Sequence, residues 1–203
     1  MSYGVVRENR EIADTSVGPA KRHMEVELPK GTTYQTGDYL VILPLNPPSL
    51  VQRVSHRFGV HDDDLIQIQG TKKAYLLSDT PQTVYEFFAT RVDLYNLATQ
   101  RQLQTLANAT EDGEEKARLN YLASSKEQFR SEILEKRASV LDVLEDHPSC
   151  KLDIGEYVDM LKPLAPRQYS ISSSSLIQSK AQDMTNPDVS SAFPIASSTS
   201  IFS

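Results

Sequence analysis

The chain has 203 residues, 39% hydrophobic and 24% charged, which suits a globular protein of one large or two small domains that buries a core. Its net charge of −6, with no local basic cluster, argues against a nucleic-acid partner. The single cysteine, Cys150, excludes a framework of intrachain disulfides, and no apolar run approaches the ~20 residues of a membrane helix. With no secretory signal visible, we expect a cytoplasmic protein without a membrane partner.

The N-terminal part of the chain combines a polar segment with two segments typical of strands. Residues 1–20 are mixed and polar, and we expect them to form a leader or linker. Met24, Val26 and Leu28 alternate with polar residues, which is the period-two pattern of a half-buried strand. Residues 39–43 form a short apolar run whose length favours a buried strand over a helix.

Helical periodicity dominates the middle of the chain. Ser49 is the expected N-cap of a first helix. Apolar residues near a 3.6-residue spacing predict a helix within residues 83–106, and residues 111–115 form an acidic loop typical of solvated surface. Further helices are expected over residues 126–134, 137–145 and 153–161. Pro163 and Pro166 then end helical structure and deliver the chain in an extended form.

The segment that follows Pro166 places a cation, an aromatic ring and a hydroxyl close together. Arg167 and Tyr169 are two residues apart, so in a strand they share one face, and Ser170 is adjacent. A guanidinium binds phosphate, a phenol ring stacks on a heteroaromatic, and a hydroxyl bonds a ring heteroatom. These groups match the needs of a flavin nucleotide. The residues alone favour the alternative, a β-strand that ends in a serine-rich turn without a ligand.

The sequence from Arg167 to Ser170 resembles the Arg-x-Tyr-Ser signature of the ferredoxin–NADP reductase superfamily. The resemblance extends from about Ala20 to Ser175, most closely to the reductase half of self-sufficient cytochrome P-450 fusions that hydroxylate fatty acids, and to NADPH–haemoprotein reductases generally. Blocks similar to the FAD-binding and connecting domain of these diflavin reductases cover residues 21–29, 34–44, 51–54, 57–59, 135–137, 140–144 and 146–150.

This resemblance implies an α+β fold, in which a partial antiparallel flavin-binding β-barrel carries an inserted all-helical connecting domain. The chain after Ser175 departs from the family pattern and is polar and serine-rich, which predicts a disordered C-terminal tail. The expected organisation is a leader or linker over residues 1–20, first barrel strands over 21–48, a mainly helical insertion over 49–162, a return to the barrel over 163–176, and the tail over 177–203.

The resemblance also implies a role in electron transfer. In the intact family, FAD accepts a hydride from NADPH and passes electrons through FMN to the haem of a monooxygenase. Arg167 would bind the FAD phosphate, Tyr169 would stack on the isoalloxazine, and Ser170 would hydrogen-bond its N5–O4 edge. Arg137, thirty residues before Arg167, corresponds to an arginine that reaches the FAD, although a helical arginine more commonly faces solvent. No side chain is expected to be catalytic, because the redox chemistry belongs to the flavin.

Several other functions lack support in the sequence. The eight glycines form neither a Gly-x-Gly-x-x-Gly turn nor a phosphate loop, and nothing resembles a flavodoxin-like FMN domain, so we expect the NADPH and FMN domains to lie outside this chain. The four histidines show no metal-ligand spacing, and the acidic run after His61 lacks that of a calcium loop. We expect no metal. The alternative function is a truncated, non-enzymatic remnant that serves as an interaction module without stable flavin.

Overall fold

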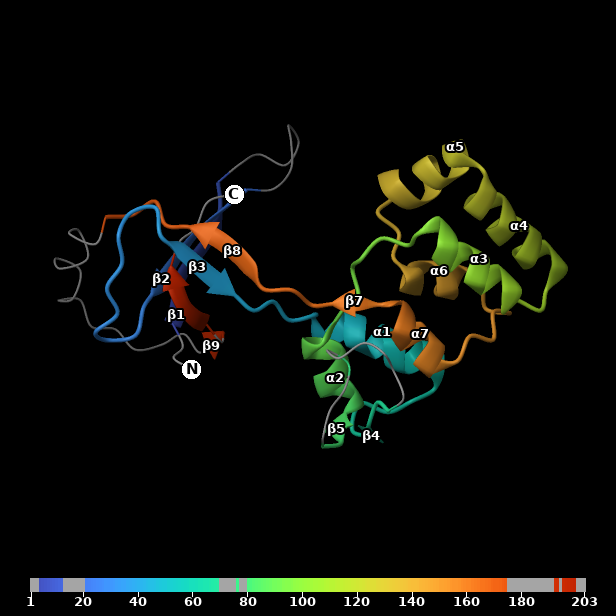
Figure 1. Cartoon of the computed structure of the whole chain (residues 1–203), viewed down its shortest axis with the longest axis horizontal. Coiled ribbons are helices and arrows are strands. Elements are labelled where there is room, and N and C mark those ends of the chain that lie inside the picture. The colour runs from blue at the N-terminus through green and yellow to red at the C-terminus, as the bar shows by residue number, and fades with distance from the viewer. Residues whose placement is uncertain are drawn as a thin grey trace. The chain divides into compact units, whose positions relative to one another are not determined.

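The chain divides into two compact units in the computed structural model (Figure 1). Unit 1 comprises residues 1–44 and 165–203, and unit 2 comprises residues 45–164. No helix in the described part of the chain is both long and apolar enough to cross a lipid bilayer. The structure describes residues 4–12, 21–69, 76, 80–174, 192–193 and 195–199, the last two ranges through their backbone alone.

Unit 1 is built from antiparallel strands. They are β1 (Gly4–Glu11), β2 (Arg22–Glu27), β3 (Tyr39–Ile42), β8 (Arg167–Ser170), β9 (Ala192–Phe193) and β10 (Ile195–Thr199). The strands form two sheets of three, in the orders β2-β1-β9 and β10-β3-β8. The protein is therefore a mixture of helices and strands, as expected, but its described strands do not close into a barrel.

Two segments that were expected to lack regular structure contribute strands to unit 1. β1 lies within the expected leader and pairs with β2 along its length, and β9 and β10 lie within the expected disordered tail. β1 escapes a search for periodicity because only polar residues follow Val5 and Val6. Pairing with a strand edge satisfies main-chain groups whatever the side chains are. The remainder of the expected tail, residues 177–191, 194 and 200–203, lies outside the described residues.

Unit 2 is mainly helical. Its helices are α1 (Pro48–Phe58), α2 (Val84–Thr90), α3 (Gln100–Asn108), α4 (Gly113–Ser124), α5 (Lys126–Phe129), the π-helical segment η2 (Arg130–Glu135), α6 (Val140–Asp146) and α7 (Ile154–Met160). Two short antiparallel ladders join β4 (Leu65–Ile66) to β5 (Gln82–Thr83) and β6 (Val92–Asp93) to β7 (Lys162–Pro163).

The helix expected within residues 83–106 is two separate helices. Thr83 caps α2 and Thr99 caps α3, each by accepting a hydrogen bond from a backbone N–H three residues later. Between them, the Asp93 carboxylate accepts a bond from the Tyr95 N–H at 3.0 Å. Such side-chain bonds to the backbone stabilise turns and caps in competition with the helix, so the apolar periodicity overestimates its length.

Two other helix starts also differ from the expectation. α1 begins at Pro48 after Pro47, so Ser49 lies inside the first turn and is not the cap; proline at N1 sacrifices no hydrogen bond. α6 begins at Val140, with Ser139 and Asp142 forming a reciprocal capping box, whereas the helix was expected from residue 137.

The hydrophobic core lies in unit 2. Its centre contains aromatic rings from three helices, in which Tyr157 of α7 lies 4.9 Å from Phe58 and 6.3 Å from Phe88, centroid to centroid. Among the described buried hydrophobic side chains, Tyr34 and Leu40 alone belong to unit 1. Unit 2 therefore holds most of the buried apolar surface that stabilises the described part of the chain.

Both ends of unit 2 are attached near the end of α2. The Asn46 N–H donates to the Ala89 carbonyl at 3.0 Å, and the Leu164 N–H donates to the Arg91 carbonyl at 2.9 Å. The buried Asn46 amide also donates to the carbonyls of Phe88 and Val92, each at 2.6 Å. The segment thus closes on itself, as a domain inserted between strands does.

Candidate functional site

The strand β8 holds three of the predicted site residues, and its register with β3 decides which way they face. The register pairs Tyr39 with Ser170, Leu40 with Tyr169, Val41 with Gln168, and Ile42 with Arg167. Directly opposed residues of an antiparallel pair project from the same face, and neighbours along a strand project from opposite faces. Arg167 and Tyr169 therefore share one face of the ribbon, whereas Ser170 projects from the other, beside the exposed ring of Tyr39.

The polar groups of this motif have no partner within the described residues. Arg167 is exposed and makes no ion pair or side-chain hydrogen bond there. The hydroxyls of Tyr169 and Ser170, both half-buried, likewise lack a hydrogen-bond partner in the described structure. As far as the described residues go, the guanidinium and the phenol can contact a ligand from the same face.

A loop before β3 holds the backbone that leaves β8. The Tyr34 hydroxyl lies 3.1 Å from the Ser173 hydroxyl, and the Thr36 hydroxyl donates to the Ser173 carbonyl at 3.1 Å. The Gly37 N–H donates to the Ile171 carbonyl at 3.2 Å from a backbone with φ of +95°, which favours glycine. Sequence reasoning missed Tyr34 and Ser173, because contacts between residues 139 positions apart leave no local signal.

Arg53, in contrast, is an arginine whose guanidinium is paired with carboxylates of the same unit. Its guanidinium bonds the carboxylates of Asp142 at 2.5 Å and of Glu145, joining α1 to α6. The hydrogen bonds that Arg53 donates to Glu145 and to Asp142 raise the Arg53 pKa above its ordinary value. Burial alone would raise the pKa of Asp142, but hydrogen bonds from Arg53 and Ser139 lower it below the ordinary value. Arg53 is thus bound to carboxylates of its own unit, whereas Arg167 bonds none in the described ranges.

Arg137, the fourth predicted site residue, lies in unit 2 in the turn between η2 and α6. It is exposed and has a φ of +55°, the positive φ of a left-handed residue. The Ala138 N–H donates to the Ile133 carbonyl at 2.9 Å and the Arg137 N–H to the Leu134 carbonyl at 3.3 Å. This is the Schellman pattern, which usually has glycine at the position of Arg137. The side chain has no partner among the described residues.

The remaining candidates from the sequence have structural roles. The acidic run after His61 forms a turn in which the Asp64 carboxylate accepts from the His61 N–H at 2.7 Å and Asp62 accepts from Ser55 at 2.6 Å. Cys150 is buried, with its thiol 3.5 Å from the Leu106 carbonyl.

Comparison with known proteins adds to this geometry. The sequence pattern of a family described as "FAD binding domain" matches residues 3–186, which is most of the chain. The chain belongs to the FAD-binding domain family. The match includes β1, both strands of the β3–β8 pair and all of unit 2, so the family assignment rests on both units.

Curated relatives of this FAD-binding domain are much longer proteins. A bifunctional cytochrome P450/NADPH–P450 reductase of Fusarium oxysporum is 44% identical over 160 residues, which cover 79% of this chain and 15% of that protein. Bifunctional cytochrome P450/NADPH–P450 reductase 2 of Bacillus subtilis (strain 168) is 37% identical over 183 residues, 90% of this chain and 17% of its own length. A bifunctional cytochrome P450/NADPH–P450 reductase of Aspergillus oryzae is 43% identical over 183 residues, 87% of this chain and 16% of its own length. The chain thus spans about one-sixth of these relatives.

Proposed function

We propose that this chain is the FAD-binding and connecting segment of an NADPH–haemoprotein reductase. Within the intact protein, electrons pass from NADPH through FAD and FMN to a haem monooxygenase. The observation that carries the proposal is that a guanidinium without a carboxylate partner among the described residues shares one face of β8 with a phenol ring, in a chain whose family is FAD-binding.

In this proposal, Arg167 binds the FAD pyrophosphate and Tyr169 stacks on the isoalloxazine. Because Arg167 bonds no carboxylate among the described residues, its fork of donors is available for phosphate oxygens. Tyr169 lies across from the buried Leu40 and is half-buried, and its hydroxyl bonds no group in the part of the chain that the structure describes. The chain binds and orients the flavin, and bound FAD supplies the redox chemistry.

Ser170 and Arg137 enter the proposal as additional contacts to the flavin. Ser170 projects from the face opposite to Arg167 and Tyr169. For Ser170 to bond the N5–O4 edge, the isoalloxazine must therefore extend around the C-terminal end of β8. Arg137 occupies a left-handed backbone position, and its long cationic side chain is available for a second phosphate contact. Residues held in unfavourable backbone conformations are concentrated at functional sites, which supports a role for Arg137.

Titration of the purified chain with FAD, followed by the quenching of flavin fluorescence, tests this function. Replacing Arg167 by alanine removes charge-assisted hydrogen bonds worth ~1.5–3 kcal/mol, so we expect the Kd for FAD to rise about 10- to 100-fold. Tyr169→Ala removes a stacking contact worth ~1–3 kcal/mol, whereas Tyr169→Phe retains the ring and most of the affinity.

Gln168→Ala is the matched control, because Gln168 is exposed on the same strand but projects from the opposite face. We expect it to leave the Kd for FAD unchanged. Equal losses in Gln168→Ala and Arg167→Ala would indicate a general effect on β8. If the wild-type chain does not bind FAD, the alternative of an interaction module without flavin gains support.

A further inference from the structure

An irregularity in β1 brings three potential metal ligands together on one face of unit 1. The register of β1 with β2 shifts between Val6 and Glu8, which is a β-bulge at Arg7. Before the bulge, Val6 lies opposite Val26; after it, Glu8 lies opposite Glu25. The bulge thus turns Glu8 to the face of Glu25, which His23 shares because it is two residues earlier in β2.

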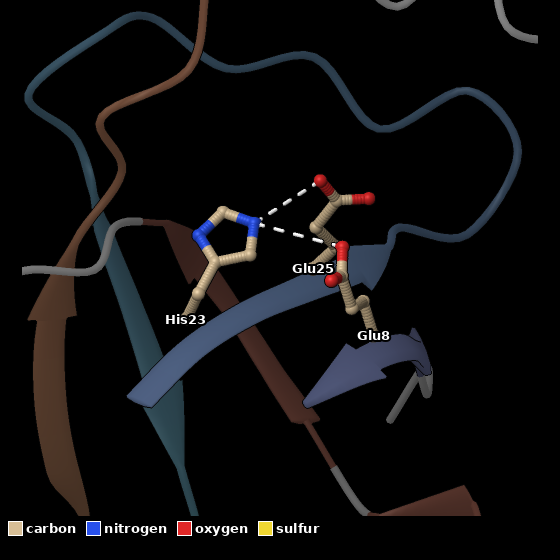
Figure 2. A group of neighbouring side chains, drawn as sticks. All are labelled: Glu8, His23 and Glu25. Carbon is tan, nitrogen blue, oxygen red and sulfur yellow. Dashed lines mark hydrogen bonds and ion pairs between the residues drawn. The ribbon is translucent and has the colours of Figure 1, made fainter. Parts of the chain in front are cut away.

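Figure 2 shows that these three side chains converge, with the imidazole of His23 pointing toward both carboxylates. The His23 Nε2 lies 3.1 Å from Oε1 of Glu25 and 3.8 Å from Oε2 of Glu8. All three ligand atoms lie within 4.8 Å of one another, and no other group of three histidine, cysteine or acidic residues in the described structure meets this criterion.

These separations are within about 0.2 Å of those in a metal site with nitrogen and oxygen ligands. Two ligand atoms on a tetrahedral zinc ion, with bonds of ~2.0–2.2 Å, lie about 3.3–3.6 Å apart. The separations from Nε2 to the two carboxylate oxygens fall on either side of this range. One imidazole and two carboxylates are a ligand set that suits Zn²⁺ and its neighbours among the divalent transition metals, with water in the open position.

The surrounding charges leave the ligand atoms available. Arg10 donates to Oε1 of Glu8 at 2.5 Å, whereas the oxygen that faces His23 is Oε2. Arg10 therefore orients the carboxylate without occupying the ligand oxygen, which is the role that residues behind metal ligands play in known sites. The other nearby pair, Arg7 with Glu27, is satisfied internally.

We propose that Glu8, His23 and Glu25 bind a divalent transition-metal ion, with Zn²⁺ as the best match to the ligand set. His23 binds through Nε2 as a neutral imidazole, and each glutamate contributes one oxygen. The site is distinct from the proposed flavin face on β8, and it ties β1 to β2 by bonds that do not depend on apolar packing.

Isothermal titration of the full chain with zinc chloride, using protein without a histidine tag, tests the proposal. We expect saturable binding of one ion per chain, and His23→Asn should weaken it at least ~10-fold. Titration with Co²⁺ supplies a readout of the ligands, because a tetrahedral site with nitrogen and oxygen ligands gives visible absorption bands that should disappear in His23→Asn. NMR should show that the His23 ring signals shift with added Zn²⁺.

His56→Asn is the matched control, since His56 is an exposed histidine on α1 of unit 2 and does not belong to the cluster, and it should leave the Zn²⁺ affinity unchanged. Glu25→Gln removes a second ligand while keeping a similar shape, so it tests the site even if His23→Asn does not fold. Zinc binding that persists in both His23→Asn and Glu25→Gln, or the absence of saturable binding to the wild-type chain, would show that the cluster is a surface ion pair only.

Discussion

Arg137 offers a direct test, at the scale of one residue, of whether function has been kept at the expense of stability. A left-handed backbone costs a residue with a Cβ ~1–2 kcal/mol. Glycine avoids this cost, but its greater conformational freedom in the unfolded chain cancels part of the gain in stability. We therefore expect Arg137→Gly to raise the free energy of unfolding by up to about 1 kcal/mol, as measured by urea denaturation. If Arg137 contacts FAD, the same variant should bind FAD more weakly.

Arg137→Lys separates the two effects, because it keeps the strained Cβ and the charge but loses the bidentate fork. A role in phosphate binding predicts a partial loss of FAD affinity with unchanged stability. If Arg137→Gly gains stability and binds FAD like the wild type, Arg137 should be removed from the proposed site.

Tyr157 is a second informative residue, because its hydroxyl is buried and has no hydrogen-bond partner among the described residues. Burying an unpaired hydroxyl costs ~1–3 kcal/mol, so Tyr157→Phe should have an unfolding free energy equal to that of the wild type or higher by up to roughly 1 kcal/mol.

The same residue also predicts a dependence of stability on pH. Burial, aided by the charge of Asp142, raises the pKa of the Tyr157 phenol. Below the unfolded-state pKa of ~10 the phenol is neutral in both states. As the pH rises further, the phenol ionises in the unfolded chain but stays neutral in the folded protein, so the free energy of unfolding falls. Tyr157→Phe should not show this loss. A clear destabilisation by Tyr157→Phe at neutral pH would indicate a partner for the hydroxyl.

At the scale of elements, the contact between α1 and α6 depends on charge. The folded-state pKa of Asp142 is lowered, so its carboxylate stabilises the protein above the unfolded-state pKa of ~3.9, and this contribution is lost as the pH falls through the folded-state pKa. We expect Asp142→Asn to lower the urea midpoint at pH 7, and the difference from the wild type to shrink as the pH falls below about 4. Midpoints measured at pH 7, 5 and 3 test this. A difference that stays constant with pH would indicate a loss of packing or capping.

The elements that the sequence predicts correctly are those with strong local signals. The alternation in residues 24–28 corresponds to most of β2, the apolar run after Asp38 corresponds to β3, and Asp153 caps α7 where a helix was expected. β1 was missed because its stability comes from main-chain pairing and from ion pairs across to β2, which leave no apolar period. A bulge such as the one at Arg7 depends on the partner strand and cannot be read from one segment.

The candidate site shows the same division. The two-residue spacing of Arg167 and Tyr169 was sufficient to predict their common face, because side-chain direction in a strand has a fixed period. The supporting contacts from Tyr34 and Thr36 come from a distant segment, and the register with β3 decides what lies opposite each residue. The contact of Arg137 with the flavin is a prediction that the Arg137 variants test, and the contact of Ser170 stays a prediction.

At the scale of the whole molecule, the two units differ in how much apolar surface they bury. Unit 2 holds most of the described core, and its two ends are hydrogen-bonded to carbonyls near the end of α2. We expect residues 45–164, produced alone, to fold cooperatively with helical circular dichroism and a urea midpoint close to that of unit 2 in the full chain. A loss of cooperative unfolding would show that unit 2 depends on unit 1 for its stability.

Ligand linkage then offers a way to assign the flavin to a unit. A ligand that binds only the folded state at about 100 times its Kd stabilises that state by ~2.7 kcal/mol. Because Arg167 and Tyr169 lie in unit 1, FAD should raise the midpoint of unit 1 in the full chain, and Arg167→Ala should reduce this increase. Riboflavin, which lacks the pyrophosphate, should stabilise less than FAD and should be insensitive to Arg167→Ala, since no phosphate remains to pair with the guanidinium. The isolated segment 45–164 is the comparison. If FAD stabilises that segment as much as the full chain, then the flavin binds the helical unit, and the β8 motif does not hold it.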